Sequence, residues 1–294
     1  MTPVVGTDGG AERNTSVHIE VPLGPDKPPV QAAAHVRHIF GVPIHAMTMA
    51  QTLDVCDQSI QARRCLMIGV VNAAKIVNMR RTPILGEAVL TSDLVLADGM
   101  AIVWASRILR QPLPERVAGI DLFENLLERA NQKGYSIYLL GATQEVMDRL
   151  TVRIRKQYPN LTIAGSRNGY FTDDQAPAIA HAIRDAKPDM LFLGMTSPKK
   201  EIFCARWAKT MNVAVCHGVG GSFDVLSGQV KRAPMVWQRL GLEWLYRVVQ
   251  EPQRMWKRYL VTNCIFIGLL FRELVHRSPT LAPEWSSHPP QNFT

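Results

Sequence analysis

The sequence lacks several features that define familiar classes of protein. It has no Asp-x-Asp motif, the carboxylate pair that holds a metal ion in many enzymes that use sugar nucleotides. Its five cysteines are scattered and form no Cys-x-x-Cys pair, so we expect reduced thiols and no structural zinc site. No basic segment followed by an apolar run opens the chain, which predicts a cytoplasmic protein without a signal peptide.

The sequence also lacks an intact dinucleotide-binding fingerprint. The segment 217–228 is rich in glycine, but G-x-G-x-x-G would require glycine at position 223, where Phe223 stands. We therefore disfavour an oxidoreductase and expect no cofactor. Closely spaced glycines still allow backbone N–H groups to surround a phosphate. The glycines concerned are Gly218, Gly220 and Gly221.

Short apolar runs rich in Val, Ile and Leu alternate with amphipathic stretches long enough for helices. This alternation predicts an α/β fold of Rossmann-like type, with a mostly parallel sheet and helices on both faces. A strand or hairpin entering a helix is expected over 39–64, and helices over 119–134 and 143–158. The predicted strands are 65–71, 93–98, 135–141, 161–165, 189–195 and 213–218.

Composition divides the chain into four parts. Residues 1–35 are rich in Gly, Pro and charge and predict a disordered leader, while 36–228 form the Rossmann-like core. Residues 229–277 predict a basic, aromatic, helical appendage that Pro252 breaks or kinks. A flexible tail is expected over 278–294.

Positive charge and aromatic rings gather in the predicted appendage. Residues 229–277 contain nine Lys and Arg against three Glu. The apolar stretch 260–270 is shorter than the roughly 20 residues that span a bilayer, so we favour a helix lying on an anionic membrane surface. Alternatively, this helix packs on the sheet or between the subunits of a homo-oligomer. Binding to nucleic acid is disfavoured because no nucleic-acid-binding motif accompanies the positive charge. The aromatic residues suited to head-group depth are Trp237, Trp244, Tyr246, Trp256 and Tyr259.

Polar residues follow the predicted strands at the sheet edge where α/β folds bind ligands. Asp98 ends an apolar strand beside a glycine, which suits a general base but also an ordinary Asp-Gly turn. Asn72 ends another strand and could contact a sugar hydroxyl, although a helix cap is the simpler interpretation. Candidate substrate contacts after the other strands, or cationic groups able to stabilise a diphosphate, are Arg116, Lys199, Lys200, Gly220, Gly221, Asp224 and Arg232.

Many of these segments occur together, in the same order, in one known family. Between residues 39 and 260 the chain resembles the WecG/TagA/CpsF glycosyltransferases, which form glycosyltransferase family 26. The motifs that carry the resemblance are VNAAKIV (71–77), LADGMAIVWASR (96–107), ERVAGIDL (115–122), YLLGAT (138–143), YPNLTIAGSRNGYF (158–171), SPKKE (197–201), GVGGSFDVLSG (218–228), KRAP (231–234) and GLEWLYRVVQEPQRMWKRY (241–259).

The resemblance implies an inverting transfer of a sugar from a UDP-sugar to an undecaprenyl-diphosphate-linked sugar, without a metal. It also implies a C-terminal membrane-binding appendage on the cytoplasmic face of the inner membrane. By position in the family motifs, the base falls on Asp98, and an acceptor-pocket residue falls on Asn72. The motif arginine is Arg116, and residues that help to hold the diphosphate are Arg247, Arg254 and Lys257.

Two residues depart from the family pattern. Lys200 stands where the family commonly has Gln, and Val70 stands where it often has Thr. Both positions are expected to line the pocket, so the donor or the acceptor sugar is expected to differ among members. We expect a neutral hexose such as glucose, used in exopolysaccharide biosynthesis.

Overall fold

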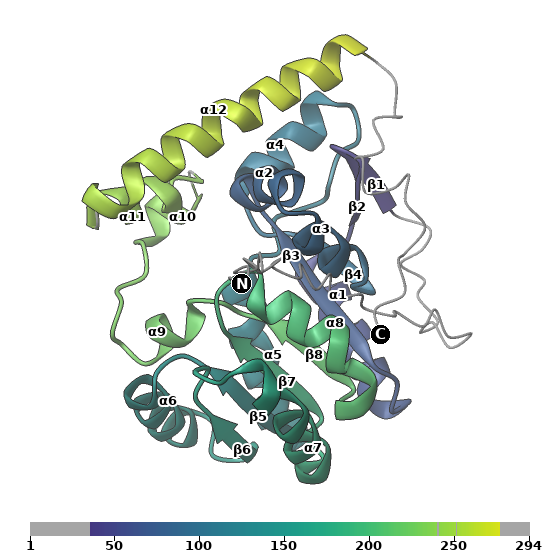
Figure 1. Cartoon of the computed structure of the whole chain (residues 1–294), viewed down its shortest axis with the longest axis vertical. Helices are drawn as coiled ribbons and strands as arrows, with labels where there is room; N and C mark the ends of the chain where they lie inside the picture. The colour runs from purple at the N-terminus through teal and green to yellow at the C-terminus, as the bar shows by residue number, and fades with distance from the viewer. Residues whose placement is uncertain (1–35, 240, 251, 277–294) are drawn as a thin grey trace, which may run out of the picture.

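The computed structural model describes residues 36–276 except Leu240 and Glu251 (Figure 1). The predicted leader and the predicted tail lie outside the described residues. The described chain begins with an antiparallel hairpin of β1 (Val36–Ile39) and β2 (Val42–His45), followed by α1 (Met49–Gln61). The hairpin and helix predicted over 39–64 are therefore confirmed.

Six of the described strands form one parallel sheet in the order β4-β3-β8-β7-β5-β6. The strands other than the edge strand β6 are largely apolar and buried because helices cover both faces of the sheet. Each predicted strand is present, with its ends within two residues of the prediction. The bounds are β3 (Leu66–Val71), β4 (Leu94–Ala97), β5 (Ser136–Gly141), β6 (Thr162–Arg167), β7 (Met190–Gly194) and β8 (Val215–Gly218).

Two layers of helices enclose this sheet, as predicted for the fold class (Figure 1). Successive strand residues point to opposite faces, so Leu139 belongs to the hydrophobic cluster that includes residues of α1, α5, α6 and α9, whereas Leu140 belongs to the one that includes residues of α7 and α8. The hairpin, α2 and α4 cover the other end of the second face. The bounds are α2 (Ala73–Arg81), α3 (Pro83–Leu90), α4 (Met100–Ile108), α5 (Gly119–Lys133), α6 (Gln144–Gln157), α7 (Ala176–Ala186), α8 (Lys199–Met211) and α9 (Ser222–Leu226).

The C-terminal region forms α10 (Met235–Arg239), α11 (Glu243–Gln250) and α12 (Pro252–His276). The break or kink predicted at Pro252 involves Glu251, which lies outside the described residues; Pro252 itself is the first residue of α12, a position where proline is favoured. α12 crosses α2 (Figure 1), and Phe266 packs edge-on against Phe40 with ring centroids 5.0 Å apart. Glu273 adds a hydrogen bond by accepting from the Phe40 N–H at 3.1 Å. One side of α12 is thus fixed to the core.

The other side of α12 exposes a row of apolar side chains. Leu260, Ile267 and Phe271 are more than half exposed and recur at spacings that place them on one helical stripe. None of the helices in the described part of the chain combines the length and the apolarity needed to cross a bilayer.

Candidate active site

A cavity of about 930 Å³ opens at the carboxyl ends of β3, β4, β7 and β8. Parallel sheets bind ligands at this edge because the loops that follow the strands gather there. Asn72, Asp98 and Gly220 line its sheet side, whereas Trp244 and Tyr259 belong to α11 and α12 on the opposite side. The cavity therefore lies between the predicted core and the predicted appendage.

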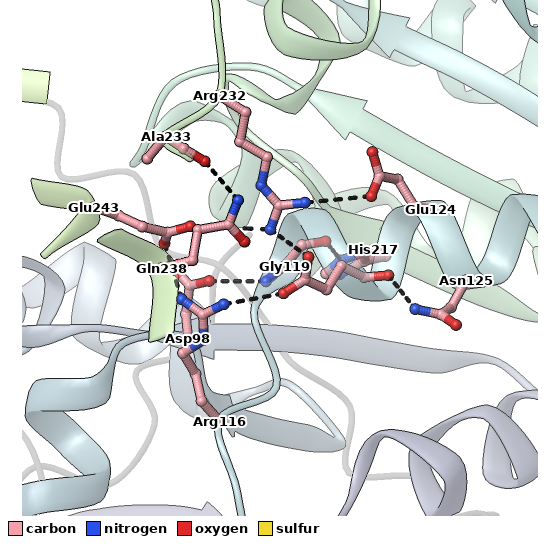
Figure 2. Close-up of polar contacts among 11 residues, drawn as sticks. Asp98, Arg116, Gly119, Glu124, Asn125, His217, Arg232, Ala233, Gln238 and Glu243 are labelled. Atoms are coloured by element: carbon pink, nitrogen blue, oxygen red, sulfur yellow. Dashed lines mark hydrogen bonds and ion pairs between the residues drawn. The ribbon is translucent and has the colours of Figure 1, made fainter. Parts of the chain in front are cut away.

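Asp98 lies on the wall of this cavity, directly after β4 (Figure 2). Its Oδ1 accepts a hydrogen bond from the Gly119 N–H at 2.8 Å, and its Oδ2 accepts one from the Asn72 side-chain amide at 3.2 Å. Each carboxylate oxygen is held by one donor and keeps a lone pair for a further partner. The carboxylate is thus fixed in direction while remaining able to accept a proton from a bound hydroxyl.

Asn72 performs the simpler role predicted for it and also contacts Asp98. Its Oδ1 accepts from the Lys75 N–H at 3.0 Å, which caps α2, while its Nδ2 donates to Asp98. The cap fixes the orientation of the amide, so the donor is aimed at the carboxylate before any ligand arrives.

His217 supports the same arrangement from beneath. Its side chain is fully buried, and its Nε2 donates to the carbonyl oxygen of Gly119 at 3.0 Å. Burial lowers the pKa of His217 to about 4, so the imidazole is neutral near pH 7. The Gly119 residue therefore links two side chains, with its N–H on Asp98 and its carbonyl oxygen on His217 (Figure 2).

The arginines expected to stabilise a diphosphate are paired with carboxylates. Arg116 donates to Glu243 at 2.9 Å and to Asp121 at 3.1 Å. Arg232 also pairs with Asp121 and reaches Glu124 at 3.3 Å (Figure 2). Both arginines line the cavity, but this network first serves to join α11 to α5 across it. Their contact with a phosphate stays a prediction.

The two neighbouring lysines have different positions. Lys199 points away from the cavity and donates to the carbonyl oxygens of Gly169 and Phe171, at 3.1 and 2.9 Å. Lys200 lines the cavity and lies along the glycine-rich turn after β8. Consecutive residues at a helix start point about 100° apart, which explains why only one of them faces the cavity.

The remaining predicted contacts are spread more widely. Gly220 and Gly221 line the cavity, whereas the Asp224 side chain on α9 is not part of the lining. Lys257 is exposed, with its Nζ 5.6 Å from the ring centre of Trp256. The side chains of Arg247 and Arg254 lie outside the described part of the structure.

A buried ion cluster was missed by the sequence analysis. Lys75 donates to Glu201 at 2.8 Å, and Lys200 lies 3.5 Å from the same carboxylate oxygen. Lys75 lies three residues after Asn72, in the segment 71–77 that carries the family resemblance. Because this spacing places both side chains near the start of α2, the sequence could have indicated Lys75 as a further site residue. Its pairing with Glu201, 126 residues later, depends on the tertiary fold.

The cavity wall facing the sheet includes a group of apolar and aromatic side chains. Trp104 of α4, Trp244 of α11 and Phe266 of α12 contribute to it, and Tyr259 packs beside Trp244 with ring centroids 5.8 Å apart. Ile267 connects this wall to the exposed stripe of α12. In the described part of the chain, no group of three His, Cys, Asp or Glu side chains is arranged to hold a metal ion.

Comparison with known proteins decides the family. A sequence model described as the glycosyl transferase WecG/TagA/CpsF family matches residues 37–280. This chain belongs to that family. It is accordingly a glycosyltransferase, with an α/β fold. A relative from Bacillus spizizenii, named N-acetylglucosaminyldiphosphoundecaprenol N-acetyl-beta-D-mannosaminyltransferase, is 41% identical over 194 residues, which cover 66% of this chain and 74% of the relative.

The two departures from the family pattern both reach the cavity. Val70 at the end of β3 and Lys200 at the start of α8 belong to its lining. A side chain at either position can therefore reach a ligand bound in the cavity.

Proposed function

We propose that this glycosyltransferase moves a sugar from a UDP-sugar to a sugar carried on undecaprenyl diphosphate, with inversion and without a metal. The single observation that carries this proposal is the Asp98 carboxylate, fixed on the wall of a large cavity at the ligand-binding edge of the sheet. The name of the Bacillus relative supports a lipid-linked acceptor. A neutral hexose such as glucose, used for an exopolysaccharide, is the donor sugar we propose.

In the proposed reaction, Asp98 accepts the proton of the acceptor hydroxyl as its oxygen attacks the anomeric carbon of the donor. The bond from that carbon to the diphosphate oxygen breaks, and UDP leaves with the electron pair. Attack from the side opposite the leaving group inverts the anomeric centre. Hydrogen bonds from Gly119 and Asn72 orient the carboxylate, so the base is positioned before the substrates bind.

The apolar wall and the exposed stripe of α12 suit the lipid part of the acceptor. A polyprenyl chain lying in the membrane would bring its diphosphate and sugar to the cavity from the side of Trp244 and Tyr259. We therefore propose that the protein works while bound to the cytoplasmic surface of a membrane.

Release of UDP tests the transfer directly. Full-length protein is mixed with a short-chain prenyl-diphosphate sugar and each of a panel of UDP-sugars, and the products are identified by mass and linkage. One elongated lipid product with an inverted anomeric centre supports the proposal. Binding of UDP-sugar without turnover on any acceptor would instead favour a binding module.

Chelation provides a second test. Excess EDTA is expected to leave the turnover unchanged, because the proposed chemistry uses a carboxylate and cationic side chains rather than a bound metal. A dialysed sample with added Mg²⁺ or Mn²⁺ serves as the comparison. Loss of turnover in EDTA that is restored by either metal would contradict the metal-independent mechanism.

His217 is expected to influence turnover through Gly119. Replacing His217 with Leu removes the donor to the Gly119 carbonyl, and we expect turnover to fall about 10- to 100-fold through misplacement of Asp98, with little change in KM. His217→Gln retains a donor and should recover much of the rate. The pH dependence of the wild type above pH 6 should show no step from His217, whose pKa of about 4 keeps it neutral there. Equal turnover in the Leu and Gln variants would show that this contact does not position the base.

A further inference from the structure

The charges on the cavity lining are divided unequally between its two sides. On the side of α11, two guanidinium groups, Arg116 and Arg232, are shared among the carboxylates of Asp121, Glu124 and Glu243. Carboxylates outnumber cations in that network, so it has no surplus positive charge to offer a diphosphate. A phosphate there would have to displace carboxylates that already make close ion pairs.

In the ion cluster of Lys75, Lys200 and Glu201, cations instead outnumber carboxylates. Lys75 and Lys200 share the single carboxylate of Glu201, and the three side chains are 10%, 11% and 8% exposed. Lys75 makes the closer contact, at 2.8 Å against 3.5 Å for Lys200. Burial alone raises the pKa of Glu201, but the two lysines lower it to about 2, so the carboxylate is ionised near pH 7. Within this three-residue cluster the cations outnumber the carboxylate by one, and Asp98 on the cavity wall is a further carboxylate whose charge acts on Lys200.

Lys200 lies against the glycine-rich turn. A methyl group on Gly218 would come within 3.0 Å of the Lys200 Cε, and one on Gly220 within 3.3 Å of its Nζ. Gly220 also has a positive φ of 56°, which favours glycine. The absence of side chains at these positions lets the ammonium group and the backbone of the turn face the cavity together.

Burial and the charge of Lys75 lower the pKa of Lys200, while the carboxylates of Glu201 and Asp98 oppose that shift. An anion bound beside Nζ would favour the charged form and offset its loss of hydration. The Lys75–Glu201 pair joins α2 to the start of α8, and Lys75 also belongs to the cavity lining.

From this geometry we infer that Lys200 and the turn at Gly218–Gly221 form a binding subsite for the phosphate oxygens of a diphosphate. The inference rests on the proposed function, which supplies two diphosphates: that of the UDP leaving group and that of the lipid-linked acceptor. In this arrangement the main role of Arg116 and Arg232 is to join α11 to the core. Lys200, which replaces the usual Gln of the family, becomes the principal cation of this subsite.

Titration calorimetry with the full-length chain tests the subsite without turnover. UDP is titrated into the wild type, Lys200→Gln and Lys209→Gln, the last removing an exposed lysine farther along the same helix. Loss of a charged hydrogen bond to phosphate predicts a Kd for UDP about 10- to 100-fold higher for Lys200→Gln and unchanged for Lys209→Gln. Lys200→Arg, which keeps the charge, should remain closer to the wild type.

A parallel titration with a short-chain prenyl-diphosphate sugar distinguishes the two sources. Weaker binding of UDP alone assigns the subsite to the donor, and weaker binding of the prenyl compound alone assigns it to the acceptor. Unchanged affinity for both would overturn the inference. Altered UDP affinity in a protein that transfers no sugar would support the subsite and reject the proposed transfer instead.

A labelling experiment on the wild type tests the same subsite without requiring that the Lys200 variants fold. The protein is treated with a trace of acetic anhydride with and without saturating UDP or prenyl-diphosphate sugar, and each lysine is quantified by mass spectrometry. Protection of Lys200 by either ligand, with Lys209 unprotected, is the expected result. Equal acetylation of Lys200 in all samples would contradict the inference.

Discussion

Replacing Asp98 with Asn is expected to lower turnover by about 10²- to 10⁴-fold, the usual contribution of a general base. The amide has nearly the same shape but cannot accept the proton of the acceptor hydroxyl. Because the donors from Gly119 and Asn72 require acceptors, one of them also loses its partner when the amide nitrogen takes the place of an oxygen. UDP release under saturating donor and acceptor measures the effect.

The matched control for this substitution is Asp148→Asn, which makes the same chemical change on the exposed surface of α6. It should leave turnover unchanged. UDP affinity should differ little between Asp98→Asn and the wild type, since Asp98 acts on the acceptor hydroxyl. Wild-type turnover in Asp98→Asn would eliminate Asp98 as the base.

The second large effect is expected at the exposed stripe of α12. Introducing Asp at both Leu260 and Phe271 should weaken binding to vesicles that contain anionic lipid by at least about 100-fold, because each apolar side chain buried in the interface contributes roughly 1.5–3 kcal/mol. Added carboxylates are also repelled by the anionic surface. Co-sedimentation with phosphatidylglycerol vesicles at physiological salt measures the change.

A double variant elsewhere on the surface controls for the added charge. Val152 on α6 and Tyr170 after β6 are also well-exposed apolar residues, and replacing both with Asp should leave vesicle binding close to that of the wild type. Turnover on a water-soluble acceptor should be similar in both double variants. If the α12 variant sediments with vesicles as before, the proposed contact between this helix and the membrane is wrong.

Most of the sheet could be predicted from the sequence because its strands are buried on both faces. Continuous apolar runs mark such strands, and β5 was expected over 135–141 and is present over Ser136–Gly141. The bounding helices also carry local signals: Thr143 caps α6, and Gly134 ends α5 with a left-handed backbone. Such capping signals involve only residues close together in the chain, so these helix ends could be predicted from the sequence.

The candidate site was predictable only in part. Asn72 and Asp98 each follow a parallel strand, so the fold class placed both at the same edge of the sheet, and the pairing of β3 with β4 brings them into contact. Glu201, the partner of Lys75, and Glu243, one of the two partners of Arg116, by contrast come from segments more than 100 residues away, and no local pattern indicates these pairings. Lys199 and Lys200 could not be separated either, because their directions depend on where α8 begins.

The far separation of Arg116 and Glu243 along the chain has a consequence for biosynthesis. The strands of the six-stranded sheet precede α10 in the sequence, so the ribosome delivers Asp98 before the cavity-lining residues Trp244 and Tyr259. A nascent chain that has folded only its sheet would already carry Asp98 but not Trp244 or Tyr259 to shelter a substrate. The cavity is completed only after these late helices have docked, once translation has passed α12.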